Sequence, residues 1–131
     1  MPTRRSRVRP PLPAPKIMKD LFNKKCKPCE GGVVPFDISE IHKYQKKVDG
    51  WNIIKNDNDI YYLEKNFKFK DFKLSQEFVN HVGNISEQEG HHPDIYFGWG
   101  YAKINITTHA IEGLCENDFI LAAKIDKITN V

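Results

Sequence analysis

One stretch of the sequence decides the fold: EQEGHHPDIYFGWGYAKINITTH, which runs from Glu87 to His109. After Pro93 it is rich in the β-branched and aromatic residues that favour strands. Gly98-Trp99-Gly100 interrupts this run near its middle, and glycine readily adopts the positive φ angles of a tight turn. The stretch therefore predicts a β-hairpin with strands over about 95–98 and 101–109.

The turn also predicts which residues of the hairpin lie opposite each other. A two-residue turn at Trp99-Gly100 sets His109 opposite Gly90. His109 should therefore lie beside the consecutive pair His91-His92 and close to Glu87. Three imidazoles and one carboxylate brought together in this way form a candidate acid/base site, because imidazole exchanges protons near neutral pH.

The rest of the chain alternates between helical and strand patterns. Asp37 and Glu40 form a helix start signal, and Asp49-Gly50 ends the run of apolar residues at helical spacing. A second helix carries an apolar stripe that we expect to be buried: Phe72, Phe78, Val79, Val82 and Ile85. Besides the hairpin, the expected elements are helices over 37–48, 71–88 and 115–127, and strands over 51–55 and 60–69.

The order of these elements, α-β-β-α-β-β-α, predicts the fold class. Two hairpins give four antiparallel strands, and the apolar faces of the helices need one face of that sheet to cover. We therefore expect an α+β fold in which a four-stranded antiparallel sheet has its helices packed on one face. Such a sheet leaves edges that must be protected or paired.

The composition indicates a single domain with an unusual beginning. The chain has 131 residues and a net charge of +3. Residues 1–17 hold five basic residues, no acidic residue and five of the eight prolines, and the remainder has 15 basic and 17 acidic residues, a net charge of −2. This acidic body argues against nucleic acid as a partner. No apolar run reaches the roughly 20 residues of a membrane span, so we expect no membrane association.

We expect residues 1–17 to be a disordered, basic, proline-rich leader, because they offer almost nothing to bury. Residues 18–131 should form the single domain, and the leader is interpreted as a non-native extension with Met18 as the original start. The alternatives are an arm that binds nucleic acid and a targeting peptide. The four prolines between residues 10 and 15 oppose the amphipathic helix of a transit peptide.

The cysteines favour a reducing compartment. There are three of them, an odd number, and no signal peptide precedes them, so we expect the protein in the cytoplasm, with the nucleus as an alternative. The sequence lacks a second Cys-x-x-Cys pair that would complete a zinc site. Cys26-Lys27-Pro28-Cys29 could be redox-active, but no preceding βαβ pattern places it at a helix N-terminus, where such thiols are activated.

The residues around the histidines also carry a family resemblance. The pattern that does so is Glu87-x3-His91-His92-Pro93-x5-Trp99-x9-His109, followed by Gly113-Leu114-x3-Asp118. It resembles the signature of the pterin-4a-carbinolamine dehydratases. The resemblance covers about residues 26–126 and includes the segment 67–72 (FKFKDF), the pair Gly50-Trp51 and the stretch 26–32 (CKPCEGG). It implies the same α+β architecture, in homodimers or homotetramers whose sheets join edge to edge.

The resemblance implies a reaction, the dehydration of a 4a-hydroxytetrahydropterin to the quinonoid dihydropterin. This step recycles tetrahydrobiopterin for aromatic amino acid hydroxylases. A hydroxyl on a saturated carbon leaves poorly unless an acid protonates it, while a base removes a proton from the adjacent ring nitrogen. The resemblance assigns these roles to His91 and His109, in an order that the sequence leaves open, and assigns His92 to holding the pterin. It implies no cofactor, because no redox change occurs, and no metal.

The resemblance assigns substrate binding to Glu87, Pro93 and Asp118. Glu87 would hydrogen-bond the amide-like edge of the pterin or orient an imidazole, and Pro93 would fix the loop. Asp118 is equally explained as a helix capping residue, because it stands three residues after the start of the last helix. Several members of that family have an acidic residue where this chain has Gly90 and an aromatic residue where it has Ile95. These departures leave the preferred pterin side chain open.

Two other functions remain open for these residues. Three histidines can form a mononuclear metal site with an open position, although the side chains of His91 and His92 diverge awkwardly for one ion. The second alternative is a non-catalytic dimerisation or transcriptional coactivator module, because vertebrate relatives also act as dimerisation cofactors for a homeodomain transcription factor. His42 and His81 lie within expected helices among polar residues and are not assigned to the site.

Overall fold

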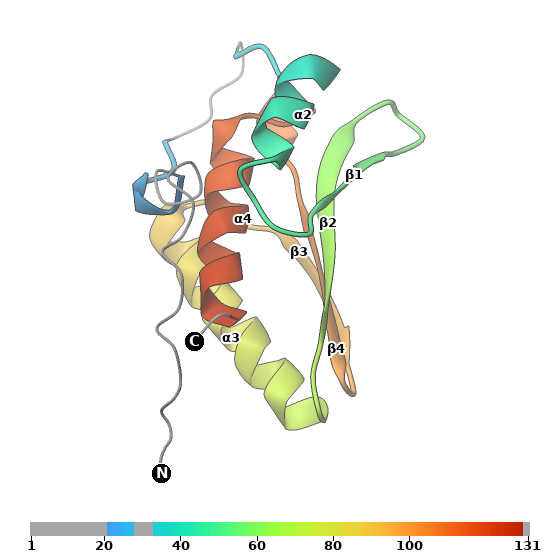
Figure 1. Cartoon of the computed structure of the whole chain (residues 1–131), viewed down its shortest axis with the longest axis vertical. Coiled ribbons are helices and arrows are strands. Elements are labelled where there is room, and N and C mark those ends of the chain that lie inside the picture. Colours follow the sequence, from blue (N-terminus) through green and yellow to red (C-terminus); the bar gives the residue numbers. More distant parts are fainter. Residues whose placement is uncertain (1–20, 28–32, 130–131) are drawn as a thin grey trace, which may run out of the picture.

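The computed structural model describes residues 21–27 and 33–129. The predicted leader, residues 1–17, and Cys29 lie outside the described residues. The elements in chain order are α2 (Ile38–Gln45), β1 (Asn52–Lys55), β2 (Tyr61–Lys68), α3 (Phe72–Glu89), β3 (Asp94–Gly98), β4 (Tyr101–Ile106), the short 3₁₀ helix η2 (His109–Ile111) and α4 (Glu116–Thr129) (Figure 1). Residues 21–23, before α2, are also helical.

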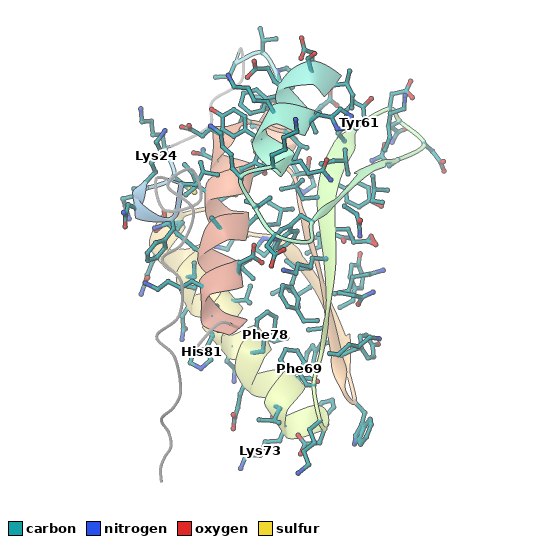
Figure 2. The ribbon with its side chains drawn as sticks, viewed as in Figure 1. Lys24, Tyr61, Phe69, Lys73, Phe78 and His81 are labelled. Carbon is teal, nitrogen blue, oxygen red and sulfur yellow. The ribbon has the colours of Figure 1, made fainter. Side chains whose placement is uncertain are left out.

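The strands form one antiparallel sheet in the order β1-β2-β4-β3. Figure 1 shows α2, α3 and α4 on one side of this sheet. The core lies between the helices and the sheet, where Figure 2 shows Phe69 and Phe78 pointing toward each other, with 5.0 Å between their ring centroids. The predicted α+β fold, a four-stranded antiparallel sheet with helices packed on one face, is confirmed.

The helices α2 and α3 begin at aspartates that cap them. The Asp37 side chain accepts a hydrogen bond from the Glu40 N–H at 2.9 Å, which starts α2. The Asp71 side chain accepts one from the Leu74 N–H, also at 2.9 Å, which starts α3. Each cap satisfies an N–H group that has no partner within its helix. The start signal predicted from Asp37 and Glu40 is therefore confirmed.

Two details of these helices differ from the prediction. α2 ends at Gln45, so Val48, which was expected in the helix, lies in the turn that follows. Phe72 was expected to be buried but is 44% exposed. Phe72 is the first residue of α3, and its ring packs against that of Phe97 in β3, with 5.5 Å between the ring centroids.

The hairpin that decides the fold has the predicted register. Gly98 pairs with Tyr101 and Asp94 with Asn105. Gly100 takes a φ of +83° in the turn, a conformation that glycine adopts without strain. The first strand of the hairpin matches its prediction within one residue, because β3 begins at Asp94 and ends at Gly98.

The second strand is shorter than predicted, because a local turn replaces its last residues. β4 ends at Ile106, and Thr108 then pairs with Gly113 in an isolated β-bridge. Between these two residues the chain forms η2, and Glu112 takes a φ of +53° to close the turn. The prediction that the strand extends to His109 was therefore wrong. His109 belongs to η2.

Gly90 ends α3 with a left-handed φ of +65°. The Gly90 N–H donates to the Glu87 carbonyl at 3.3 Å, and the His91 N–H donates to the Ser86 carbonyl at 3.1 Å. Together these bonds form a Schellman motif, which closes a helix and turns the chain away from its axis. The glycine therefore releases His91 and His92 into the extended segment that leads to β3.

Helix α4 is buried on nearly all of its sides. Six of its apolar residues are at most 2% exposed: Phe119, Ile120, Leu121, Ala122, Ala123 and Ile125. Even so, none of the helices in residues 21–27 and 33–129 is long and apolar enough to cross a membrane. Two carboxylates are buried in the same helix, Asp118 at 0% and Asp126 at 2% exposure. Because a buried charge is costly unless it is paired and hydrogen-bonded, both ends of α4 need specific partners.

The partners of Asp126 come from the first part of the sheet. Its carboxylate accepts hydrogen bonds from the Trp51 indole N–H at 3.0 Å, the Lys65 ammonium at 2.8 Å and the Asp49 N–H at 3.2 Å. Burial raises the pKa of Asp126 above its usual value, and the bonds from Lys65, Asp49 and Trp51 oppose only part of this shift. The network ties α4 to the segment before β1 and to β2.

Two glycines, one inside α3 and one directly after it, should respond in opposite ways to replacement by alanine. Gly90→Ala should lower the free energy of unfolding by about 1–2 kcal/mol, because a Cβ atom disfavours the left-handed conformation. Gly83→Ala should raise it by about 0.5–1 kcal/mol, because glycine is a poor residue for a helix interior. A Cβ atom would meet nothing within 4 Å at either position. Urea unfolding checks both variants, and effects of the same sign would contradict the role given to Gly90.

The raised pKa of Asp126 predicts a pH dependence of stability. In the folded protein the Asp126 carboxyl holds its proton more tightly than it does in the unfolded chain, where its pKa has the usual value of 3.8. The contribution of this group to stability is therefore largest below 3.8, falls as the pH rises through the folded pKa and is constant above it. Asp126→Asn lacks this titration, so wild type should lose stability relative to the variant over that window. Urea unfolding between about pH 4 and pH 7 measures the difference. A difference independent of pH would contradict the prediction.

Candidate functional site

A cavity of about 150 Å³ lies at the end of the sheet where β3 begins and β4 ends, and both His92 and His109 line it. The rest of its wall is polar and consists of Asn56, Tyr62, Asp94, Asn105 and Thr107. Asn105 stands between Ile104 and Ile106, which are fully buried under the helices. Because side chains alternate along a strand, the cavity opens on the face of the sheet that the helices leave uncovered.

The two consecutive histidines point to opposite sides, as successive residues of an extended segment do. His91 turns toward α4, where its Nε2 lies 2.7 Å from Asp118 Oδ1 and its side chain is 12% exposed. His92 turns toward the cavity, where its Nε2 contacts Glu87 Oε2 and its side chain is 61% exposed. Each imidazole therefore has its own carboxylate, one in the interior and one at the surface.

The structure brings together only some of the residues that the sequence placed in the site. His92 and His109 line the same cavity, as the hairpin register predicted, although His109 stands in η2. Glu87 joins them through its contact with His92. His91 is not among the residues that line the cavity, because it faces the interior and Asp118.

Asp118 connects the site to α4. Its Oδ2 accepts hydrogen bonds from the Cys115 N–H and from the Thr108 hydroxyl, both at 2.8 Å, while its Oδ1 faces His91. The bond from Cys115 is half of a capping box, so the capping role considered for Asp118 is fulfilled in the structure. The carboxylate is 0% exposed, which places it behind His91 and away from the surface of the cavity.

The positions of Pro93 and Trp99 exclude direct contact with the cavity. Pro93 joins the histidines to β3 and is half-buried, but it is not among the residues that line the cavity. Its ring favours extended backbone at His92, which keeps the two imidazoles on opposite sides. Trp99 is 72% exposed in the hairpin turn, at the other end of the hairpin from the cavity.

Five residues of the cavity wall were not predicted from the sequence. Thr107 and Asn105 could have been found, because strand alternation places them on the same face as each other and close to His109. Asp94 directly follows Pro93 in the motif. Asn56 lies in the connection between β1 and β2, and Tyr62 lies in β2. No local signal marks either residue, because their place in the site depends on how β2 pairs with β4.

Residues 21–27 dock beside the site. The Cys26 N–H donates to Glu89 Oε1 at 2.8 Å, and the Lys27 N–H donates to Asn117 Oδ1 at 3.0 Å. The pKa of Glu89 is lowered in spite of its burial, because the Cys26 N–H and Lys124 stabilise its carboxylate. These bonds connect the segment to the end of α3 and the start of α4, the two elements that hold the interior pair His91 and Asp118.

The same docking makes Cys26 an unreactive thiol. Burial raises the pKa of Cys26 to about 12, and the nearby carboxylate of Glu89 adds to this shift. A thiol with such a pKa is protonated at neutral pH, whereas reactive cysteines are thiolates. Among the described residues, no three histidine, cysteine, aspartate or glutamate side chains are grouped so that they could hold a metal ion.

Most of the chain matches one protein family. Residues 34–128 match the sequence profile of the family described as pterin 4 alpha carbinolamine dehydratase. A protein of Rubrobacter xylanophilus is 42% identical over 111 residues, which are 85% of this chain and 100% of that protein. A protein of Rickettsia bellii is 46% identical over 114 residues, which are 87% of this chain and 98% of that protein. Both are provisionally named pterin-4-alpha-carbinolamine dehydratases.

Two solved structures are similar to this one. The transcriptional coactivator/pterin dehydratase from Brucella melitensis has a TM-score of 0.65 and 28% identity and covers 72% of this chain and 97% of its own. A pterin dehydratase-like protein, identified as a RuBisCO assembly factor in the alpha-carboxysome, has a TM-score of 0.52 and 25% identity and covers 60% of this chain and 88% of its own. Residues 34–128, which match the family, contain the whole histidine motif and all the strands of the sheet. The chain therefore belongs to the pterin-4a-carbinolamine dehydratase family.

Proposed function

We propose that this chain dehydrates 4a-hydroxytetrahydropterins to quinonoid dihydropterins and so recycles tetrahydrobiopterin. One observation carries the proposal: two imidazoles, those of His92 and His109, face one polar cavity, and the buried carboxylate of Asp118 holds a third imidazole, that of His91, next to His92 in the chain. The dehydration needs an acid and a base that both work near neutral pH, which imidazoles provide. The family to which the chain belongs supports the same reaction.

In this proposal His91 and His109 transfer the protons. One of them protonates the hydroxyl on C4a, and the C–O bond breaks as water leaves. The other accepts the proton of the adjacent ring nitrogen, whose electrons form the new C–N double bond. Asp118 supports His91 in this role, because a buried carboxylate keeps an imidazole in one orientation and offers a countercharge when the ring carries a proton.

His92 and Glu87 are proposed to bind the pterin ring. Their side chains are 61% and 78% exposed, and His92, which Glu87 contacts, lines the cavity, so the pair can reach the polar edge of a ligand that enters from solvent. Pro93 contributes by holding His92 in an extended conformation. Asp118 contributes through His91, since its own side chain is 0% exposed. The reaction includes no electron transfer, so no cofactor is part of the proposal.

We also propose that the protein acts as a homodimer or homotetramer in the cytoplasm, where it would serve an aromatic amino acid hydroxylase pathway. β3 is an edge strand of the sheet, and exposed aromatic residues gather on it, on its turn and at the first residue of β4: Tyr96, Phe97, Trp99 and Tyr101. An unpaired edge with apolar side chains favours association with another chain. The same surface is the observation that favours the second candidate function, a non-catalytic interaction module.

A stopped-flow assay with a 4a-hydroxytetrahydropterin tests the proposed activity. Protein treated with a chelator should accelerate the dehydration above its spontaneous rate, because protonation by imidazoles needs no Lewis acid. Loss of activity on chelation and its return with zinc would instead favour a metal site. The absence of any acceleration over the spontaneous reaction would favour the interaction module.

The histidines should separate by role when they are replaced singly. His91→Ala and His109→Ala should each lower kcat by about 10²- to 10⁴-fold and leave KM largely intact, the usual range for general acid and base groups. His92→Ala should mainly raise KM. His42→Ala is the matched control, because His42 is exposed on α2 and should have almost no effect.

Two measurements accompany these variants. The spontaneous rate must be subtracted from each kcat, and circular dichroism must show that each variant is folded. If folded His91→Ala keeps the full kcat while His92→Ala loses it, proton transfer belongs to the pair that lines the cavity, and the role given to His91 is wrong. If all three variants keep the full kcat, the site lies elsewhere.

A further inference from the structure

Thr108 is a buried residue that lies between the two histidines proposed to transfer protons. It directly precedes His109, and its side chain is part of the group around Asp118. Its exposure is 4%, so a substrate in the cavity does not reach it. The sequence pattern around the histidines gives it no role.

The backbone of Thr108 is fixed by the turn that carries His109. The Thr108 N–H donates to the Gly113 carbonyl at 2.9 Å, and the Gly113 N–H donates to the Thr108 carbonyl at 3.3 Å. Gly113 lies where a Cβ atom would come within 2.7 Å of Pro35, so this close approach requires glycine. The bridge closes η2 and sets the position from which the His109 side chain reaches the cavity.

The side chain of Thr108 fixes the carboxylate that holds His91. Both the Thr108 hydroxyl and the Cys115 N–H donate to Asp118 Oδ2, at 2.8 Å each. Oδ1 is thereby left for His91 Nε2, at 2.7 Å. Rotation of the carboxylate would break both bonds to Oδ2, and a buried carboxylate oxygen without donors is unfavourable.

This arrangement also determines which nitrogen of His91 is available for proton exchange. A carboxylate oxygen only accepts hydrogen bonds, so His91 Nε2 must carry the hydrogen. In the neutral ring Nδ1 is then the nitrogen that can take up a proton. The orientation of Asp118, which Thr108 helps to fix, therefore sets both the tautomer and the direction of the His91 ring.

We propose that Thr108 is a positioning residue of the dehydratase site, which holds His109 through its backbone and His91 through its hydroxyl and Asp118. The inference rests on the proposed function, because it assigns proton transfer to these two histidines. Its geometric part does not depend on any activity. Thr108 thus links the two histidines, although one lies between α3 and β3 and the other in η2.

The test compares Thr108→Val with Thr108→Ser. Valine keeps the shape of threonine and removes the hydroxyl, whereas serine keeps the hydroxyl. Thr108→Val should lower kcat by about 10- to 100-fold, the effect of losing one hydrogen bond to a buried carboxylate, with KM within about twofold of wild type. Thr108→Ser should recover most of the loss. Should the valine variant fail to fold, Thr108→Ala removes the same hydroxyl without adding a methyl group to the site.

Ser75→Ala is the matched control for the loss of a buried hydroxyl. Ser75 is 0% exposed and its hydroxyl donates to the Asp71 carbonyl at 3.1 Å, at the far end of α3 from the site. It should lower stability slightly and leave kcat unchanged. A fall in kcat of the same size in both variants would show that loss of a buried hydroxyl acts through general stability, and would overturn the proposal.

A second readout is independent of catalysis. The ring nitrogens and the Nε2–H proton of His91 can be followed by ¹⁵N–¹H NMR, with the assignment made from the signals lost in His91→Gln. Thr108→Val should shift these signals or speed their exchange with water, whereas Thr108→Ser and Ser75→Ala should leave them in place. Unchanged His91 signals in Thr108→Val would overturn the proposal whether or not the protein is a dehydratase. Shifted signals in a protein without activity would overturn the proposed function and keep the geometry.

Discussion

The near-complete burial of α4 is the constraint on which the rest of this structure depends. A helix packed in this way excludes water from most of its length, and yet this one carries a buried carboxylate near each end. Each carboxylate must then find donors inside the protein. Asp126 finds them on Trp51 and Lys65, and Asp118 finds them on Thr108 and at the N-terminus of its own helix. The packing of α4 therefore also determines where the site lies.

The arrangement of the site follows from the bonds of Asp118 and from the alternation of side chains along an extended segment. Asp118 draws His91 to the interior, and because neighbouring residues of an extended segment face opposite ways, His92 must face the cavity. A histidine pair that looks symmetrical in the sequence thus becomes two groups in different surroundings. One imidazole is oriented by a buried carboxylate, and the other contacts Glu87 at the surface. This difference supports different roles in one reaction.

The parts of this arrangement that depend on local backbone chemistry could be read from the sequence. The Gly98-Trp99-Gly100 turn predicted the hairpin register, and Asp37 predicted the start of α2, because both act within a few residues. The prediction placed His109 in the strand because it did not foresee the bridge between Thr108 and Gly113, which competes with the pairing of β4 with β3. That bridge depends on the close approach of Pro35 to Gly113. The sequence did not show which of His91 and His92 faces the interior, because this depends on the position of Asp118 in the fold. Cavity residues such as Asn56, in the connection between β1 and β2, are distant from the histidine motif in the sequence and gave no local signal.

Gly90 shows how the backbone and the ligand chemistry compete at one position. An acidic residue there would bring a further carboxylate next to the histidines. In this chain the position has a φ of +65°, where glycine avoids the strain that a side chain would cause, and the helix ends cleanly before His91. The polar wall of the cavity is then supplied by other elements, by Asp94 at the start of β3 and by Asn56 and Asn105 from the neighbouring strands and their connection. The pairing of β2 with β4 therefore helps to shape the wall of the cavity.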